Sequence, residues 1–334
     1  MSEKENTGST EVSKARFVIV DADDAEQRID NYLLRVLNGV PKSRIYKMLR
    51  KGEVRVNKGR VKPTTRLAAG DSVRIPPVYI DERAAAAPPA SALATLKARV
   101  LFEDKSLLVI NKPSGMAVHG GSGLSFGVIE TLRSAGGDWA GLGLAHRLDR
   151  ETSGVLVLSK KRSALRALHA AFREDRVSKV YQALVAGNWQ QGAMTIDAPL
   201  AVNERRSGER HVSVAADGKP SITRVSPIEV RKAASLLTLR PESGRTHQIR
   251  VHLQHMGHPI AGDSRYGDPA VNAEFRADGL KRLFLHAQSI AFDDGNGQEQ
   301  LFSAPLPERL QEYVVKILAR PSVNTTRRRK YLKS

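Results

Sequence analysis

The stretch around Asp149 places charged residues directly before an apolar run, which is an unusual setting for an aspartate. Arg147 and Arg150 flank it, and Val155–Leu158 predict a buried strand a few residues later. A carboxylate held in such a place can serve as a nucleophile or as a general base. Charges before a strand are more often solvated loop residues. Other parts of the chain must therefore decide between the two interpretations.

Four histidines between His247 and His258 are typical of a metal site. If this segment is helical, His247 and His252 lie about 140° apart around the axis, and only His252 and His255 share a face. The segment contains no carboxylate and no H-E-x-x-H pattern. We therefore predict that the chain binds no metal.

Three other chemistries fit the sequence less well. Glycoside hydrolysis needs two acids that flank a sugar, whereas Asp149 and Glu151 would point to one side of an extended strand. Glu151 fits either of two roles: the second acid, or a charge that only balances Arg147 and Arg150. No G-x-S-x-G motif supports a serine nucleophile. The glycine-rich loop after the strand at 107–110 lacks the G-x-G-x-x-G spacing, so we expect no nucleotide cofactor.

The composition indicates a polyanionic partner. Lys and Arg number 53 against 35 Asp and Glu, a net charge of +18, and nucleic acid is the commonest cellular polyanion. A membrane-surface protein would need a lysine-rich amphipathic helix with apolar anchors, which the sequence lacks. The absence of cysteine excludes disulfides and fits a reducing cytoplasm. No signal peptide and no run of about 18 apolar residues is present, so we expect a cytoplasmic protein without membrane contact.

The N-terminal part predicts two helices followed by short strands. We expect disorder over residues 1–16, a strand at 17–20, and a first helix capped by Asp24. Ser43 caps a second helix that ends at Gly52, and strands follow near 54–57 and 73–75. The apolar faces consist of Ile29, Tyr32, Leu33, Val36 and Leu37 in the first helix, and of Ile45, Met48 and Leu49 in the second.

The second helix also carries a basic face. Arg44, Lys47 and Lys51 share one outward side with Arg50 beside it, and residues 28–66 hold twelve Lys or Arg against two acids. A solvated basic surface would have the same pattern. A DNA-binding helix–turn–helix also fits the helices, but the strand directly after the second helix favours another module.

Residues 39–60, GVPKSRIYKMLRKGEVRVNKGR, are similar to the S4 RNA-binding module. This resemblance implies that the second helix and the loop after it contact RNA phosphates, which need charge rather than a base-specific group. The residues that it assigns to RNA binding are Lys42, Arg44, Lys47, Arg50 and Lys51.

A second domain follows the first after a linker. Residues 81–97 are expected to be a linker, because Pro88 and Pro89 stop a helix and the stretch has no apolar face. We assign residues 17–80 to the S4 domain, 98–320 to a catalytic domain and 321–334 to a basic tail. The second domain is expected to contain a hairpin at 100–110, a helix at 163–173, and strands near 177–185, 221–225 and 235–240.

Three motifs in the second domain resemble the RluA/RluC/RluD family of pseudouridine synthases. They are HRLDRETSGVLVLSK at 146–160, KVYQALV at 179–185 and GRTHQIRVH at 244–252. Two further segments, 118–130 and 282–287, are most similar to the RluC branch. Many relatives have Asp at the position of Glu151. The resemblance implies an α+β fold: an S4 domain followed by a catalytic domain with a mixed, largely antiparallel sheet.

The family resemblance also implies a role for each of four residues. Asp149 matches the catalytic aspartate. Arg147 matches the arginine that fills the gap left in the RNA when the uridine flips out. Tyr181 matches the tyrosine that packs on the flipped base. Arg245 matches the arginine expected to pair with Asp149 and keep it ionised and aimed. Taken alone, Tyr181 would be a core aromatic and Arg245 a surface charge.

The implied activity is the isomerisation of specific uridines in 23S ribosomal RNA to pseudouridine, at several sites, by a monomeric enzyme without a cofactor. Asp149 would attack C1′ or C6 or remove the C2′ proton, and the sequence does not choose among these. Two alternatives stay open: an inactive, ribosome-associated RNA-binding protein, and a synthase acting on tRNA or another RNA.

Overall fold

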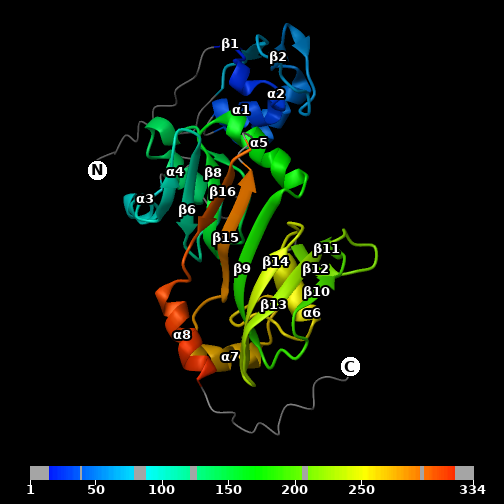
Figure 1. Cartoon of the computed structure of the whole chain (residues 1–334). Helices are drawn as coiled ribbons and strands as arrows, with labels where there is room; N and C mark the ends of the chain where they lie inside the picture. The colour runs from blue at the N-terminus through cyan, green and yellow to red at the C-terminus, as the bar shows by residue number, and fades with distance from the viewer. Residues whose placement is uncertain are drawn as a thin grey trace, which may run out of the picture. The chain divides into compact units, whose positions relative to one another are not determined.

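The computed structural model describes residues 15–37, 40–78, 88–120, 126–204, 210–293 and 297–319. The chain forms two compact units, one made mainly of residues up to Pro88 and the other starting at Pro89 (Figure 1). Most of the predicted disordered N-terminus, much of the linker and the whole basic tail lie outside the described residues. Residues 17–80 and 98–320 remain our proposed domain boundaries.

The first unit packs two helices on a small antiparallel sheet. The strand order is β1-β4-β2-β3, and the helices are α1 (Ile29–Val36) and α2 (Lys42–Lys51). The inward positions predicted for Ile29, Tyr32, Leu33, Leu37, Ile45, Met48 and Leu49 are confirmed, because all of them are buried. The strands are β1 (Arg16–Ile19), β2 (Arg55–Val56), β3 (Gly59–Arg60) and β4 (Ser72–Ile75).

Both helix starts differ from the prediction. Asp24 does not cap α1: it ends the 3-10 turn η1 (Ala22–Asp24), because the Asp21 carboxylate accepts a hydrogen bond of 2.8 Å from its amide. The helix α1 begins only at Ile29. Similarly, α2 begins after Pro41 rather than at Ser43, since a proline has the φ that a helix start requires. The predicted end at Gly52 is confirmed, with φ of 69°.

A helix occupies part of the predicted linker. The helix α3 (Ala90–Lys97) starts directly after Pro89, so the proline pair precedes a helix instead of ending one. A proline at this end is tolerated because the first amides of a helix have no partner within it. Leu96 is completely buried and packs into the core of the second unit, which gives α3 its stability.

The second unit is built on a ten-stranded sheet. Its order is β10-β13-β14-β9-β15-β8-β6-β5, with β16 added to β15 and β7 to β8. Among the described strands only β15 and β8 pair in parallel, which confirms the mixed, largely antiparallel sheet. The strands are β5 (Val100–Glu103), β6 (Leu107–Lys112), β7 (Gly143–Leu144), β8 (Ser153–Ser159), β9 (Val177–Ala186), β10 (Met194–Asp197), β13 (Ile222–Val230), β14 (Ala234–Pro241), β15 (Leu285–Asp293) and β16 (Glu299–Ser303).

Helices cover this sheet and close three hydrophobic cores. One core joins β9, β10, β13 and β14 to α6 (Gln248–His255), α7 (Pro269–Ala277) and α8 (Glu308–Leu318). A second joins β6 and β8 to α3 and α4 (Val128–Arg133), with η2 (Gly137–Trp139) beside it, and a third holds α5 (Arg162–Arg173). The hairpin β11 (Leu200–Glu204) and β12 (Arg210–Val214) forms a separate small sheet.

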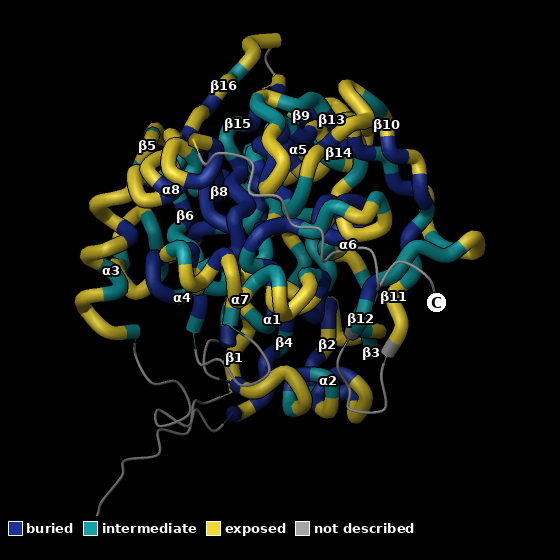
Figure 2. The backbone as a smooth tube through the Cα atoms, turned by 90° about the horizontal axis from the view of Figure 1, so that it is seen from below, coloured by how far each residue is buried: buried dark blue, intermediate teal, exposed yellow. Residues whose placement is uncertain are grey.

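The strand β8 is buried along its whole length, as predicted for residues 155–158, and appears dark blue in Figure 2. It lies between β6 and β15. Gly154 has φ of 116°, and a Cβ atom there would lie 2.1 Å from the carbonyl oxygen of Ala287 on β15. Only glycine allows this approach. The loop that carries Asp149 therefore leads directly into the centre of the sheet.

Candidate active site

One cavity of about 580 Å³ brings the predicted site residues together. Asp149, Arg147, Tyr181 and Arg245 all line it, although Arg147 and Arg245 lie 98 positions apart in the sequence. Its walls are the loop before β8, the end of α5, the strand β9, and the segment that runs from the end of β14 into α6. The four residues thus share one concave site within the second unit.

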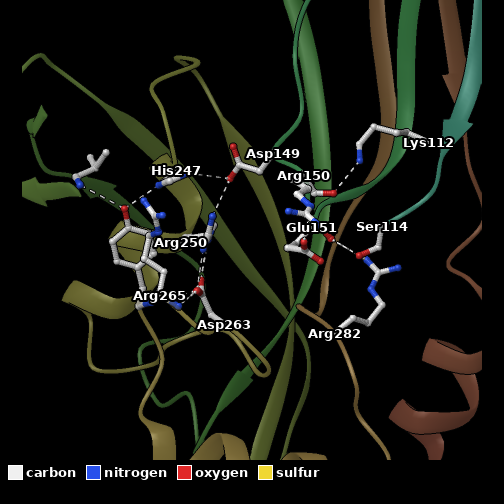
Figure 3. A network of polar contacts seen from close by, with 12 residues as sticks. Lys112, Ser114, Asp149, Arg150, Glu151, His247, Arg250, Asp263, Arg265 and Arg282 are labelled. Carbon is white, nitrogen blue, oxygen red and sulfur yellow. Dashed lines mark hydrogen bonds and ion pairs between the residues drawn. The ribbon is translucent and has the colours of Figure 1, made fainter. Parts of the chain in front are cut away.

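Lys112 holds the loop that presents Asp149. Its side chain is fully buried at the end of β6, and its ammonium donates hydrogen bonds to the carbonyl oxygens of Pro113 (2.8 Å), Met116 (2.7 Å) and Arg150 (3.0 Å) (Figure 3). Burial lowers the pKa of Lys112 to about 7. The backbone directly after Asp149 is therefore fixed by a buried amino group.

Two further polar contacts fix the same loop from other segments. The Ser114 hydroxyl donates to the carbonyl oxygen of Glu151 at 2.7 Å, and Arg282 donates to the Ser153 hydroxyl at 2.8 Å. The Ser153 hydroxyl also lies 2.9 Å from Nδ1 of His286. Burial lowers the pKa of Arg282 to about 10 and that of His286 to about 4. The loop is thus preorganised on both sides of β8.

Arg250 is the ion-pair partner of Asp149. Its Nη1 lies 3.1 Å from Oδ2 of Asp149, while Nε and Nη2 make a two-pronged contact with Asp263 at 2.8 and 2.9 Å (Figure 3). Burial alone would raise the pKa of Asp263, but the hydrogen bonds from Arg250 lower it overall. Burial likewise opposes the charge of Arg250, yet the two carboxylates raise its pKa. The guanidinium therefore stays charged and cannot rotate away from Asp149.

The expected pairing of Arg245 with Asp149 is wrong. The Nε atom of Arg245 donates to the carbonyl oxygen of Pro220 at 3.3 Å, and its amide donates to the Gln248 side chain at 3.0 Å. The reason is where α6 begins. Arg250 lies in the first turn of this helix and points at Asp149, whereas Arg245 lies in the turn before it. Arg245 still lines the cavity, and its role in substrate binding stays a prediction.

His247 approaches the same carboxylate oxygen as Arg250. Its Nε2 lies 3.8 Å from Oδ2 of Asp149, and its Nδ1 lies 2.8 Å from the hydroxyl of Tyr266. Burial lowers the pKa of His247 to about 4, so the ring is neutral at pH 7. The other carboxylate oxygen, Oδ1, makes no hydrogen bond with any residue that the structure describes.

Tyr181 and Arg147 differ in their surroundings. Tyr181 on β9 packs against two of the hydrophobic cores while it lines the cavity. Burial, and then the charge of Asp149, raise the pKa of its phenol, which therefore stays neutral. Lys179, two residues earlier on the same face of β9, also lines the cavity and donates to the Ser243 carbonyl oxygen at 3.3 Å. Arg147 is exposed at the cavity and free to move toward a ligand.

The basic residues of the first unit lie mostly in solvent. Lys42, Lys47, Arg50 and Lys51 are exposed on α2 or at its ends. Arg44 is partly buried and forms an ion pair with Glu53 at 3.2 Å. Contact of these residues with RNA stays a prediction.

The histidines of α6 have structural partners. His252 is buried, with its Nδ1 2.9 Å from the Thr223 hydroxyl and its Nε2 2.9 Å from the carbonyl oxygen of Ala198. Within the described ranges, no cluster of three or more His, Asp or Glu side chains has the arrangement of a metal site. The same residues include no helix with the length and apolar character of a membrane span.

Several site residues were not singled out from the sequence. Arg250 lies within the quoted motif at 244–252, but spacing alone does not distinguish it from Arg245. Asp263 and Tyr266 lie outside every quoted motif. One feature of the sequence could have indicated Lys112: it is a charged residue two positions after the apolar run at 107–110 and directly before a proline. A lysine there must either leave the sheet or be buried with acceptors.

Comparison with known proteins agrees with this geometry. Residues 106–255 match the family model of RNA pseudouridylate synthase, and residues 27–73 match that of the S4 domain. Ribosomal large subunit pseudouridine synthase C of Pasteurella multocida (strain Pm70) is 52% identical over 312 residues, 92% of this chain and 96% of that protein. The protein of the same name from Escherichia coli (strain K12) is 52% identical over 313 residues, 92% of this chain and 98% of that protein. The solved structure of human RNA pseudouridylate synthase domain containing 4 superposes with a TM-score of 0.57 at 25% identity, covering 68% of this chain and 95% of that one.

Proposed function

The chain belongs to the family of RNA pseudouridylate synthases, and from this premise we propose that it modifies 23S ribosomal RNA with Asp149 as the catalytic carboxylate. As a member of this family it is an isomerase that converts uridine in RNA to pseudouridine. The large-subunit target is supported by the names of relatives that align over nearly the whole chain. One observation supports the catalytic role of Asp149. Its carboxylate lines a cavity that Tyr181 also lines, and Oδ1 makes no hydrogen bond with the described residues.

The reaction needs one carboxylate and no outside reagent. The N1–C1′ bond of the uridine breaks, a C5–C1′ bond forms, C5 loses a proton and N1 gains one. The base is both leaving group and returning nucleophile, so no cofactor is required. Asp149 would attack C1′ or C6, or take the proton from C2′. Each of these steps needs an oxygen that is not held by a hydrogen bond, and Oδ1 meets that requirement.

The uridine must leave the RNA stack to reach the cavity, because a stacked base is inaccessible. Arg147 is exposed at the cavity, so its guanidinium is available to take the place of the flipped base or to grip phosphate. Tyr181 offers the flipped base a flat, neutral ring. Arg245 is a further cation that lines the cavity and that we assign to substrate binding.

The S4 unit would provide affinity for the RNA around the target uridines. Its exposed cations Lys42, Lys47, Arg50 and Lys51, with Arg44, suit phosphate contacts. We infer that the partner is 23S rRNA or an assembly intermediate of the large subunit, modified at several uridines in the cytoplasm by a monomer.

Replacement of the proposed catalyst tests this function. Asp149→Asn should keep its affinity for a 23S rRNA fragment and form no detectable pseudouridine, whereas Asp138→Asn, at an exposed aspartate, should behave as the wild type. Pseudouridine mapping in RNA from a deletion strain should show the loss of specific 23S sites. Normal product from Asp149→Asn would contradict the catalytic role, and loss of pseudouridine only from tRNA would contradict the target.

A further inference from the structure

We propose that His247 is a positioning residue for Asp149: held by Tyr266, its Nε2–H group faces Oδ2 of the carboxylate and favours one orientation of it, which leaves Oδ1 to react. This inference rests on the proposed function, in which Asp149 is the catalytic group. The two residues lie 19 positions apart, His247 directly before α6 and Tyr266 in the loop before α7.

A chain of four groups leads from the hairpin β11–β12 to the carboxylate. The amide of Val212 on β12 donates to the Tyr266 hydroxyl at 3.3 Å. That hydroxyl lies 2.8 Å from Nδ1 of His247, and Nε2 of the same ring lies 3.8 Å from Oδ2 of Asp149. A hydroxyl that accepts from an amide has its own proton left to donate. We therefore assign that proton to the bond with Nδ1, which makes Nε2 the protonated nitrogen facing Asp149.

The surroundings hold the imidazole in this orientation. Tyr266 is 6% exposed, and its ring meets that of His247 edge-on at 5.5 Å. The guanidinium of Arg250 lies 5.0 Å from the centre of the Tyr266 ring on its face. His247 itself has φ of 53°, a left-handed conformation that residues other than glycine rarely adopt. Such a conformation persists where the surrounding contacts determine it, and this is typical of functional sites.

The charged groups around His247 act on its pKa in both directions. Asp149 and Asp263 favour a protonated ring, whereas Arg250 and Arg265 oppose it. Burial is the largest influence and keeps the ring neutral, so His247 does not change charge near neutral pH. Its contribution is therefore an oriented N–H group rather than a charge or a proton in transit.

The two donors act on the same oxygen. Arg250 at 3.1 Å and His247 at 3.8 Å both face Oδ2, from different directions, because one lies on α6 and the other precedes it (Figure 3). At 3.8 Å the neutral His247 ring makes no hydrogen bond to Asp149, so its N–H dipole attracts Oδ2 electrostatically beside the hydrogen bond from Arg250. Both interactions favour one orientation of the carboxylate about its Cβ–Cγ bond. The other oxygen then keeps one orientation toward the cavity. Such alignment raises the rate at which the bound RNA reacts more than it raises the affinity of the enzyme for the RNA.

The experiment removes the hydroxyl that orients the ring. Tyr266→Phe should slow pseudouridine formation about tenfold at saturating RNA, with RNA affinity within about twofold of the wild type. Tyr313→Phe is the matched control, because Tyr313 is also 6% exposed and its hydroxyl bonds a backbone carbonyl of Phe275, outside the cavity. This control should keep the wild-type rate.

A second variant and a spectroscopic measurement separate positioning from general damage. His247→Asn suits the left-handed backbone, which asparagine tolerates, and should show the same slow rate with unchanged affinity and thermal midpoint. Nitrogen NMR of the wild type at pH 7 should show His247 neutral with its proton on Nε2. Wild-type rates in both variants, or a proton on Nδ1, would overturn the proposal. Wild-type enzyme that forms no pseudouridine in any RNA would instead overturn the proposed function.

Discussion

The S4 unit and the synthase cavity use the same residue types in opposite ways. On α2 the cations Lys47, Arg50 and Lys51 are exposed and have room to follow a partner. In the synthase unit Lys112 and Arg250 are buried, and each has fixed acceptors at 2.7 to 3.1 Å. Exposed cations act through charge, which any other cation can replace. Buried ones act through geometry, so a substitution that keeps the charge still breaks the site.

The strongest test of this contrast is an Arg→Lys exchange in each unit. Arg250→Lys keeps the charge but loses the planar guanidinium, whose three nitrogens bond Asp263 and Asp149 at the same time. We expect pseudouridine formation to fall at least about 100-fold and the free energy of unfolding to fall by about 3 kcal/mol. Arg44→Lys should change the rate of pseudouridine formation by less than about twofold and the free energy of unfolding by less than about 0.5 kcal/mol. Rate measurements and urea unfolding of the two variants check this, and equal behaviour would remove the contrast.

The next test concerns pH and the buried lysine. Lys112→Met removes a buried amino group that faces three carbonyl oxygens. At pH 9.5 this group is a neutral amine with two N–H donors, and its loss should lower the free energy of unfolding by about 2 kcal/mol. In the wild type the folded pKa, about 7, lies below the ordinary value of 10.5. Between these values the unfolded chain binds more protons, so the wild type gains stability as pH rises, by up to about 1.4 kcal/mol per pH unit.

Urea unfolding of wild type and Lys112→Met at pH 7 and pH 9.5 measures this linkage. The wild type should gain stability relative to the variant over that interval, because the variant lacks the Lys112 amino group and both proteins share all other titrating groups. Parallel curves for the two proteins would mean that Lys112 is not the group responsible.

A smaller effect is expected from the exposed cations. Neutralising Arg44, Lys47 and Lys51 to Gln should weaken RNA binding and flatten its logarithmic salt dependence by about 2, since each phosphate contact contributes about 0.7 to 0.9. The rate at saturating RNA should not change. Single variants sharpen the test: Lys47→Gln should reduce the slope more than Arg44→Gln, because Glu53 already pairs with Arg44. An unchanged slope would argue against phosphate contacts by α2.

The smallest effect is expected for Glu151, the other acid near the catalyst. Its carboxylate is 45% exposed and meets Arg150 only at 3.4 Å, whereas its backbone carbonyl accepts the Ser114 hydroxyl. Glu151→Gln should therefore alter the rate of pseudouridine formation by less than about twofold. A tenfold loss, measured at saturating RNA, would show that a second carboxylate takes part in the chemistry.

The sequence predicted those features whose cause is local. The apolar run at 155–158 predicts β8, and the helical spacing of Ile45, Met48 and Leu49 predicts the inward face of α2; both are confirmed. The motifs also supplied Asp149, Arg147 and Tyr181 as cavity residues. Helix starts were less predictable, because Asp21 and Pro41 compete with the expected caps at Asp24 and Ser43.

The partners of Asp149 could not be predicted from the sequence because they depend on where α6 begins. Arg250 lies in the first turn of α6 and Arg245 in the segment before it, and the spacing of the two arginines does not show which of them faces Asp149. Asp263 and Tyr266 reach the site from a loop beyond α6, and no periodic pattern marks such a residue. The burial of Lys112 likewise depends on three carbonyl groups, one of which belongs to Arg150, 38 residues away.

The continuous sheet has a consequence for how a substrate enters. Asp149 precedes β8, Tyr181 lies on β9 and α6 follows β14, and these strands are joined through β15 into one hydrogen-bonded ladder. Widening the cavity by a hinge would break ladder bonds, so the movement has to occur in the RNA instead. The free energy of unstacking the uridine then enters the reaction barrier. Uridines in loops and weak helices should therefore react faster than those in stable duplexes, whatever their neighbouring bases.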